Sequence, residues 1–162
     1  MDVRKLLLQQ LGELLHVEET LADEVLPELE RKVSERHLRE ALTAHREQTH
    51  GHVQRMEQAF DRLKEKPQRH PSHGFAGLRK QHEETVGRLV SAPLRDLYCA
   101  SSAAQTEHFE ISSYHSAITL ANIAGEPEIV RLLDANLHEE EDALEKVEKA
   151  LPERLAGVLA PA

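Results

Sequence analysis

The chain has 162 residues and a formal net charge of −9, and 40% of its residues are hydrophobic but only 3% aromatic. This length suits one domain with a sizeable core, and the scarcity of aromatic side chains favours helices that pack through Leu, Val and Ala. The negative charge argues against nucleic acid and anionic membranes as partners, because both need clustered basic residues. No stretch approaches the roughly 20 apolar residues of a membrane span. We therefore expect a single domain over residues 1–162, with no nucleic-acid and no membrane partner.

The N-terminal residues and the cysteine content indicate the compartment. Residues 1–15, MDVRKLLLQQLGELL, have charges on either side of a short apolar run and no small-residue cleavage site. They predict the start of a helix rather than a signal peptide. The single cysteine, Cys99, allows no internal disulfide. Together these features favour a cytoplasmic protein.

Residues 2–64 predict two long helices. The first covers residues 2–33, and Pro27 is expected to bend it or to end its regular part early. Ser34 is the expected cap of the second helix, which runs to about residue 64. The connection between the two helices is short, so they should form an antiparallel hairpin.

A long connection with its own short helix follows. Residues 65–74 contain two prolines and a glycine that break the helical pattern, and residues 75–89 predict a short helix. The third long helix begins near Pro93 and ends near Gly125, a residue type favoured just past a helix C-terminus. The fourth begins at Glu126-Pro127 and is closed by Pro152.

The order of these elements predicts the fold. Two tight helical hairpins joined by one long crossover are the ferritin-like variant of a four-helix bundle. No strand pattern competes with the helical periodicity. We therefore predict an all-α, ferritin-like four-helix bundle with a short extra helix in the crossover between helices 2 and 3.

In each long helix, one apolar stripe is interrupted near its middle by a residue type that binds metal. Steps of three and four residues place each stripe on one helix face. A carboxylate in a buried stripe costs several kcal/mol unless it is paired, protonated or coordinated, so the interruptions suggest a shared reason. The stripes are Leu7, Leu11, Leu14, Glu18, Leu21, Val25; Leu38, Leu42, His45, Thr49, His52, Met56, Leu63; Leu97, Ala100, Ala104, Glu107, Ile111, Tyr114, Ile118; and Val130, Leu133, Leu137, Glu140, Leu144, Val147, Leu151.

The interruptions are predicted to lie in one layer. They are close to the midpoints of their helices, which lie level in a bundle of similar-length helices, and an offset of two residues is only about 3 Å at a rise of about 1.5 Å per residue. Carboxylate and imidazole ligands from several helices form the di-iron and di-manganese sites of bundles. We therefore predict two iron or manganese ions at the bundle centre. Their predicted ligands are Glu18, His52, Glu107, Glu110 and Glu140.

Four sequence runs resemble a known family. The run His45–Glu57 resembles the second-helix motif of the YciF/YciE ferritin-like proteins, and the run Ala104–Tyr114 closely resembles their third-helix signature. Leu137–Glu141 resembles the fourth-helix motif, and Glu18, with the Leu26-Pro27 pair downstream, resembles the first. The resemblance covers nearly the whole chain in the right order. It implies a ferritin-like bundle, a homodimer, a di-metal centre and a stress-associated role.

The chain departs from the family pattern at several positions. Gln48 stands where the family usually has glutamate, and a neutral amide is a poor bridging ligand. Glu47 and His50 have the ligand spacing of ferritin-like proteins but lie off the stripe, so we expect them to face water. The fourth helix has Ala143 where a histidine would complete the spacing, whereas His52 lies on the stripe and could replace a missing ligand. A full ferroxidase ligand set is therefore not present.

Each candidate ligand also has a plainer interpretation. Glu18 and Glu107 are expected as ligands or in a structural polar network, and the plainer alternative is a tolerated position at the edge of the stripe; Glu110, beside the stripe, fits a ligand and a solvated flank equally. Glu140 lies between two further glutamates, and charge runs usually face solvent. The plainer interpretation of His52 is a histidine that hydrogen-bonds to a buried carboxylate, and His45 is expected to be a core histidine of this kind.

Three other side chains of the third helix carry expectations of their own. The hydroxyl of Tyr114, on the stripe, should donate a hydrogen bond to a carboxylate. His108 and His115, beside the stripe, are candidates for contact with a partner subunit.

Three functions remain open from the sequence. The first is a ferritin-like metal-binding protein whose two ions keep open positions for small oxidants, and whether it is an oxidase is left open. The second is a metal-free helical bundle, with a structural polar core, that self-associates or binds a partner. The third is a histidine-rich surface that buffers metal through His70, His73 and their neighbours.

Overall fold

The computed structural model describes residues 2–150, without the side chains of residues 149 and 150. All regular elements within this range are helical, as predicted. They are α1 (Val3–Thr20), the π-helical segment η1 (Leu21–Val25), α2 (Leu26–Lys32), α3 (Arg36–Arg62), α4 (His73–Val86), α5 (Ala92–Ala124) and α6 (Pro127–Ala150). The expectation that Pro152 closes the fourth helix lies outside the described residues.

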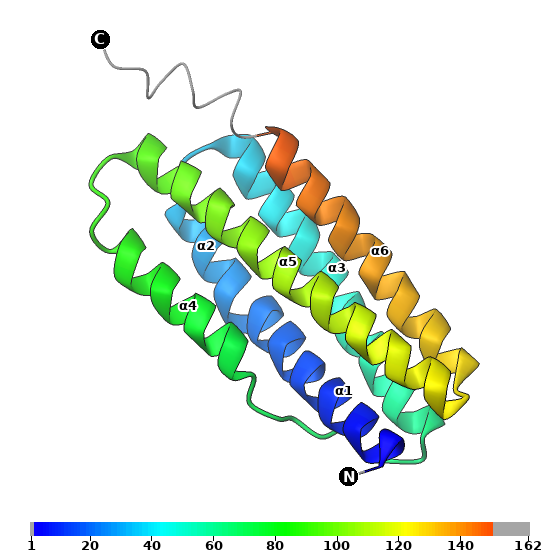
Figure 1. The fold of residues 1–162 in the computed structure, drawn as a ribbon. Helices are drawn as coiled ribbons and strands as arrows, with labels where there is room; N and C mark the ends of the chain where they lie inside the picture. Colours follow the sequence, from blue (N-terminus) through cyan, green and yellow to red (C-terminus); the bar gives the residue numbers. More distant parts are fainter. Residues whose placement is uncertain (1, 151–162) are drawn as a thin grey trace.

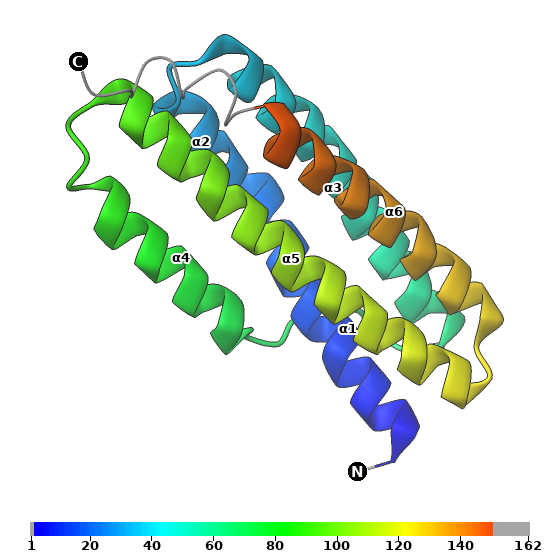
Figure 2. The same cartoon turned by 45° about the horizontal axis from the view of Figure 1, so that its top comes forward.

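The long helices form an antiparallel bundle (Figure 1). Helices α1 and α6 each pack against both α3 and α5, so the four helices form a closed ring. Helix α4 packs against α5, and both views place it on the side of the bundle opposite α6 (Figures 1 and 2). This is the predicted ferritin-like four-helix bundle, with the short helix in the crossover.

Most helix ends follow the expected capping rules, but one predicted cap was wrong. The carboxylate of Asp2 accepts a hydrogen bond from the backbone N–H of Lys5 at 2.8 Å and begins α1. Helix α3 is capped by Glu35, not by the predicted Ser34, because the Glu35 carboxylate accepts from the N–H of Leu38 at 2.6 Å. Gly125 ends α5 at φ 73°, in the left-handed region that favours glycine.

The first predicted helix is divided by η1, which ends two residues before Pro27. A π-turn inserts one extra residue, and such turns are frequent at functional sites. The N–H of Leu26 bonds to the carbonyl of Leu21, five residues earlier, and Pro27 has no N–H to continue the α-helical ladder. The regular part of the first helix therefore ends at Thr20, two residues after Glu18.

The apolar interior consists of two clusters, one toward each end of the bundle. One cluster includes Leu11, Phe60 and Leu133, and the other includes Leu26 and Leu42. On α3, the buried His45, Thr49 and His52 lie between Leu42 of one cluster and Met56 of the other, and on α5 Glu107 and Glu110 lie between Ala100 and Tyr114. The predicted polar layer therefore separates two dry regions.

The predicted stripe of α3 is buried, and the first stripe is buried except for the half-buried Val25. On α6, Leu133, Leu137 and Glu140 are buried but Val130, Leu144 and Val147 only half-buried, and the stripe of α5 is displaced. Ala104 and Ile111 are only half-buried, whereas Ala103, Glu107 and Glu110 are buried. Because α5 contacts α1, α4 and α6, it buries a wider face than a single heptad stripe can describe. The displacement places Glu110 inside the bundle and excludes the solvated-flank interpretation.

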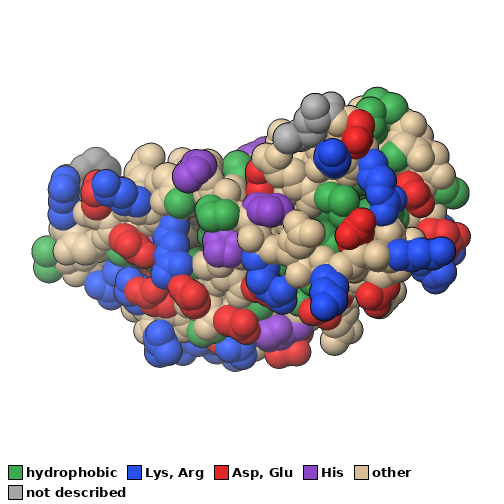
Figure 3. Space-filling model, turned by 90° about the horizontal axis from the view of Figure 1, so that it is seen from below, with side chains coloured by type: hydrophobic (Ala, Val, Ile, Leu, Met, Phe, Trp, Pro, Cys, Tyr) green, Lys and Arg blue, Asp and Glu red, His purple; other side chains and the backbone are tan. Residues whose placement is uncertain are grey.

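The surface carries a mixture of charged and hydrophobic side chains. On the face seen in Figure 3, acidic and basic side chains alternate, hydrophobic side chains are scattered, and several histidines lie near the middle. None of the helices in the described part of the chain contains an apolar stretch of the length that a membrane span requires.

Candidate metal centre

A layer of ionisable side chains crosses the middle of the bundle, and every long helix contributes to it. Its members are all buried, with none more than 7% exposed. They are Glu18 of α1, His45 and His52 of α3, Glu107 and Glu110 of α5, and Glu140 of α6. The structure thus brings together all five predicted ligands and adds His45.

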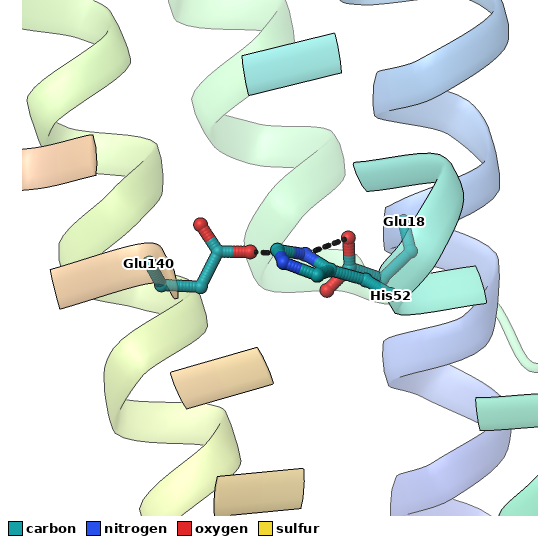
Figure 4. Close-up of side chains that lie close together, drawn as sticks. All are labelled: Glu18, His52 and Glu140. Atoms are coloured by element: carbon teal, nitrogen blue, oxygen red, sulfur yellow. Dashed lines mark hydrogen bonds and ion pairs between the residues drawn. The ribbon is translucent and has the colours of Figure 1, made fainter. Parts of the chain in front are cut away.

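One group of three surrounds the imidazole of His52. Its Nδ1 lies 3.2 Å from Oε2 of Glu18 and 2.8 Å from Oε1 of Glu140, so the ring bridges two carboxylates from different helices (Figure 4). One ligand atom from each of the three residues lies within 4.8 Å of the others. Three donors at this separation can hold one metal ion between them.

A second group surrounds His45 and shares Glu140 with the first. The Nε2 atom of His45 lies 3.2 Å from Oε1 of Glu107 and 3.7 Å from Oε2 of Glu140. This trio also has one ligand atom per residue within 4.8 Å of the others. Glu140 directs one oxygen to each histidine, which is the position of a bridging carboxylate between two ions.

Glu110 is the least satisfied member of the layer. Its side chain is fully buried, and neither carboxylate oxygen has a hydrogen-bond partner among residues 2–150. Burial, together with the charges of Glu140, Glu18 and Glu107, raises its pKa well above 4.5. A buried carboxyl in this position must be protonated or must face a cation, so its oxygens fit the requirement for a metal.

The electrostatics of the layer favour proton retention when no metal is bound. Burial raises the pKa of Glu107 and Glu140 to about 7, and it also raises the pKa of Glu18. Burial alone lowers the pKa of His52, but the negative charges of Glu18 and Glu140 outweigh it and raise the value to about 11. The metal-free layer therefore contains an imidazolium cation between carboxylates.

Further side chains support Glu18. The hydroxyl of Tyr114 donates a hydrogen bond to Oε1 of Glu18, which confirms the expected phenol–carboxylate contact. The amide of Asn136 donates to the Tyr114 oxygen at 2.8 Å. This chain of hydrogen bonds leaves Oε2 of Glu18 directed toward His52.

An ion pair between Glu139 and Arg55 contacts the second ring nitrogen of His52. Its Nε2 lies 2.9 Å from Oε2 of Glu139, and Arg55 Nη2 lies 2.6 Å from the same oxygen. A metal-bound histidine commonly donates its other N–H to a carboxylate in this manner. The pair was not predicted from the sequence, although Arg55 lies one helical turn after His52 and therefore on nearly the same face.

The other residues considered from the sequence lie outside the layer. Glu47 and His50 are exposed, as expected, and Gln48 is half-buried. His70 and His73 line an open hollow near α1, but no third metal-binding side chain completes a group with them within the described chain. His108 is exposed and lies 3.2 Å from Glu148.

The fold and the layer define a class: a ferritin-like helical bundle with a buried cluster of carboxylates and histidines. The chain belongs to the family described as a domain of unknown function (DUF892), which matches residues 2–159. It is 32% identical over 116 residues to Protein YciF of Escherichia coli, covering 71% of this chain and 70% of that protein. The resemblance to YciF-type proteins is therefore confirmed.

Solved structures agree with this assignment. YcfI from Rhodopseudomonas palustris superposes with a TM-score of 0.90 at 31% identity, over 93% of this chain and 95% of that chain. The E. coli stress protein YciF superposes with a TM-score of 0.88 at 27% identity, over 96% and 98% of the two chains. The shared architecture extends over nearly the full length of each protein.

Proposed function

We propose that this protein binds two iron or manganese ions in the central layer. The proposal rests on one observation: two groups of three buried ligands, from α1, α3, α5 and α6, share Glu140. Each group combines one imidazole with two carboxylates. Oxygen-rich ligation of this kind suits iron or manganese better than copper, and neither group contains the thiolates typical of structural zinc sites.

Charge balance supports two divalent ions rather than one. Glu18, Glu107, Glu110 and Glu140 carry four negative charges when ionised, which equals the charge of two divalent cations. Two cations therefore remove the repulsion that would otherwise accompany four buried carboxylates. His45 and His52, two turns apart on α3, supply neutral donors that offset the loss of a bridging glutamate at Gln48.

Metal analysis of the untagged protein tests the proposal. After metal removal and dialysis against Mn²⁺ or anaerobic Fe²⁺, we expect about two ions per chain by elemental analysis, as in two-metal sites generally. Glu107→Ala should abolish core metal, whereas Glu47→Ala, which removes an exposed carboxylate on α3, should retain it. A wild-type protein that binds no metal under these conditions refutes the proposal.

A metal-free bundle remains the alternative, because hydrogen bonds already connect part of the layer. Glu18 is held by Tyr114 and His52, and His52 is held in turn by Glu139. In that case the buried acids and imidazolium form a structural network, and function lies in self-association. Light scattering of Glu107→Ala would then show the same oligomer as the wild type, together with no bound metal in either.

We further propose a homodimer with a stress-associated role in the cytoplasm. The E. coli relative is described as a stress protein, and it shares the fold over nearly its whole length. Multi-angle light scattering of the full chain tests the dimer directly. A monomer at micromolar concentration would leave the metal layer intact but would rule out the dimer.

A further inference from the structure

A hollow lies between α1 and α5, beyond the N-terminal end of α4. Figures 1 and 2 show α4 beside the half of the bundle that contains α2, so α4 leaves the N-terminal half of α1 uncovered. The lining comes from α1, from α5 and from Ser72, the residue directly before α4. We call it the α1–α5 hollow. Its volume is about 220 Å³, and by the same measure one water needs about 10–15 Å³, so it admits a small organic molecule.

Three polar side chains of this hollow offer acceptor oxygens to a bound molecule. The Oε1 atom of Gln10 is buried and has no hydrogen-bond partner within the described chain. Ser113 donates its hydroxyl proton to the backbone carbonyl of Phe109 at 2.8 Å, so its oxygen is left to accept. The carboxylate of Glu13 accepts a hydrogen bond from Nε2 of Gln9 at 3.0 Å and has further acceptor capacity. A molecule that satisfies these oxygens must supply N–H or O–H donors.

The charge of the hollow selects a cation. Among the described residues that line it, Glu13 is the only one with a charged side chain, and it forms no ion pair within the described chain. A carboxylate without an ion-pair partner attracts positive charge and repels anions. A metal ion fits poorly, because this lining offers it one carboxylate and no histidine or cysteine. The favoured ligand therefore has its positive charge on a group with several N–H donors.

Part of the wall is hydrocarbon. Leu14 and Val17 line the hollow from α1 and are only 3% and 1% exposed. Phe109 lines it from α5, and an aromatic ring can contact either an alkyl chain or a cation. A short alkyl chain beside the charged group would therefore lose apolar surface to water on binding here.

We propose that the α1–α5 hollow binds a small organic cation, a primary ammonium group on a short alkyl chain. The N–H groups of the ammonium pair with the acceptor oxygens, foremost the carboxylate of Glu13 and Oε1 of Gln10. The alkyl chain packs on Leu14 and Val17. No predicted metal ligand lines this hollow, so the inference does not depend on the proposed metal centre.

An adjoining hollow is the competing location for the same ligand. It is the open hollow lined by His70 and His73, with a volume of about 540 Å³, and it shares Glu13 with the α1–α5 hollow. Its lining also includes Lys5, whose positive charge repels an ammonium group. Leu8 lines this second hollow and not the first, so its methyl groups report on binding there.

Three small molecules of similar size and different charge test the inference: butylammonium, 1-butanol and butyrate. In the methyl-labelled full chain without metal, at pH 7.5, butylammonium should shift the methyl resonances of Leu14 and Val17 with a dissociation constant of about 1–10 mM. The methyl resonances of Leu133, inside the apolar core, should not move. We expect 1-butanol to bind at least about fivefold more weakly and butyrate not to bind.

Two variants identify the groups that hold the ammonium. Glu13→Gln keeps the shape and an acceptor oxygen but removes the charge, so it should weaken butylammonium binding about three- to tenfold and leave 1-butanol binding unchanged. Gln10→Met removes the unpaired acceptor at similar size and should weaken butylammonium binding about two- to fivefold. Glu47→Gln, the control on α3, removes the same charge from the chain and should bind butylammonium like the wild type.

Four results would each overturn the inference. They are equal affinity for butylammonium and 1-butanol, tighter binding of butyrate, unchanged butylammonium affinity in Glu13→Gln, and larger shifts at Leu8 than at Leu14 and Val17. Mn²⁺ uptake by Glu13→Gln should equal that of the wild type, because Glu13 lies outside the central layer. Metal binding without butylammonium binding would therefore refute the assignment of the hollow alone, and the reverse would refute only the proposed function.

Discussion

At the scale of single residues, the carboxylates of the layer differ in how well hydrogen bonds satisfy them. Glu18 is well supported, because Tyr114 and His52 both bond to it. Glu110 has no partner within the described chain, and it is the residue for which burial is hardest to explain without a cation. We therefore expect substitutions of Glu110, and of the residues that contact His52, to affect metal binding and stability differently.

Glu110→Gln should stabilise the metal-free protein at pH 7.5 while weakening metal binding. The raised pKa of Glu110 means that the folded state must retain a proton there, which an amide does not require. We expect a gain of about 1–3 kcal/mol in urea unfolding, with a loss of at least one bound Mn²⁺. The exposed control Glu47→Gln should change neither quantity; a destabilised Glu110→Gln would contradict the assignment.

Removing the outer carboxylate should loosen His52. In Glu139→Ala, the Nε2 of His52 loses its acceptor, and Arg55 loses its partner. Loss of such outer contacts typically lowers metal affinity by about 10–100-fold, measurable by Mn²⁺ titration. Glu139→Gln, which keeps an acceptor oxygen, should be closer to the wild type, and the exposed neighbour control Glu141→Ala should be unaffected.

At the scale of elements, the crossover lies tightly against the bundle at one point. The N–H of His70 donates to the carbonyl of Gly12 at 3.1 Å. A Cβ at Gly12 would lie 2.4 Å from Cδ2 of His70 and 3.1 Å from the carbonyl oxygen of Gln68. The absence of a side chain at Gly12 therefore lets the crossover approach α1.

Two glycine substitutions should have opposite effects on stability. Gly12→Ala should destabilise the protein by about 1–3 kcal/mol, because the crossover must move. Gly77→Ala on α4, where nothing lies within 4 Å of the new Cβ, should stabilise it by about 0.5–1 kcal/mol through helix propensity. Thermal unfolding of the two variants measures both; equal signs would show that the contact at Gly12 is unimportant.

The positions of the long helices were predictable from the sequence. The π-turn, and which residues of α5 are buried, were less predictable. Heptad stripes and proline positions located the long helices, and steps of seven residues placed His45 and His52 on one face. The π-turn at Leu21–Val25 has no periodic signal, because it inserts one residue without changing the residue types around it. The burial of Glu110 depends on the neighbours of α5, which no single-helix pattern contains.

At the scale of the whole molecule, stability should depend on pH and metal together. A carboxyl with a raised folded-state pKa contributes full stability below its ordinary value of 4.5 and loses it as the pH rises through its folded value, about 7 for Glu107 and Glu140. The imidazolium of His52 stabilises fully below 6.5 and loses its contribution as the pH approaches about 11. Both effects weaken the metal-free protein with rising pH.

The melting temperature of the metal-free protein should therefore fall between pH 5 and 8, and that of the Mn²⁺-loaded protein should fall less. Cations and protons compete for the same ligands, so the difference between the two curves should widen with pH. Differential scanning fluorimetry across this range measures both. A constant difference would indicate that metal binds elsewhere than at the titrating layer.

The division of the apolar interior into two clusters has a consequence for local motion. Because the buried apolar residues form two separate clusters, we expect that in the absence of cations either end of the bundle can open while the other remains closed. Ions bound by residues of all four long helices would link the two ends of the bundle. Metal supply would then determine whether the chain fluctuates as two loosely joined units or as one.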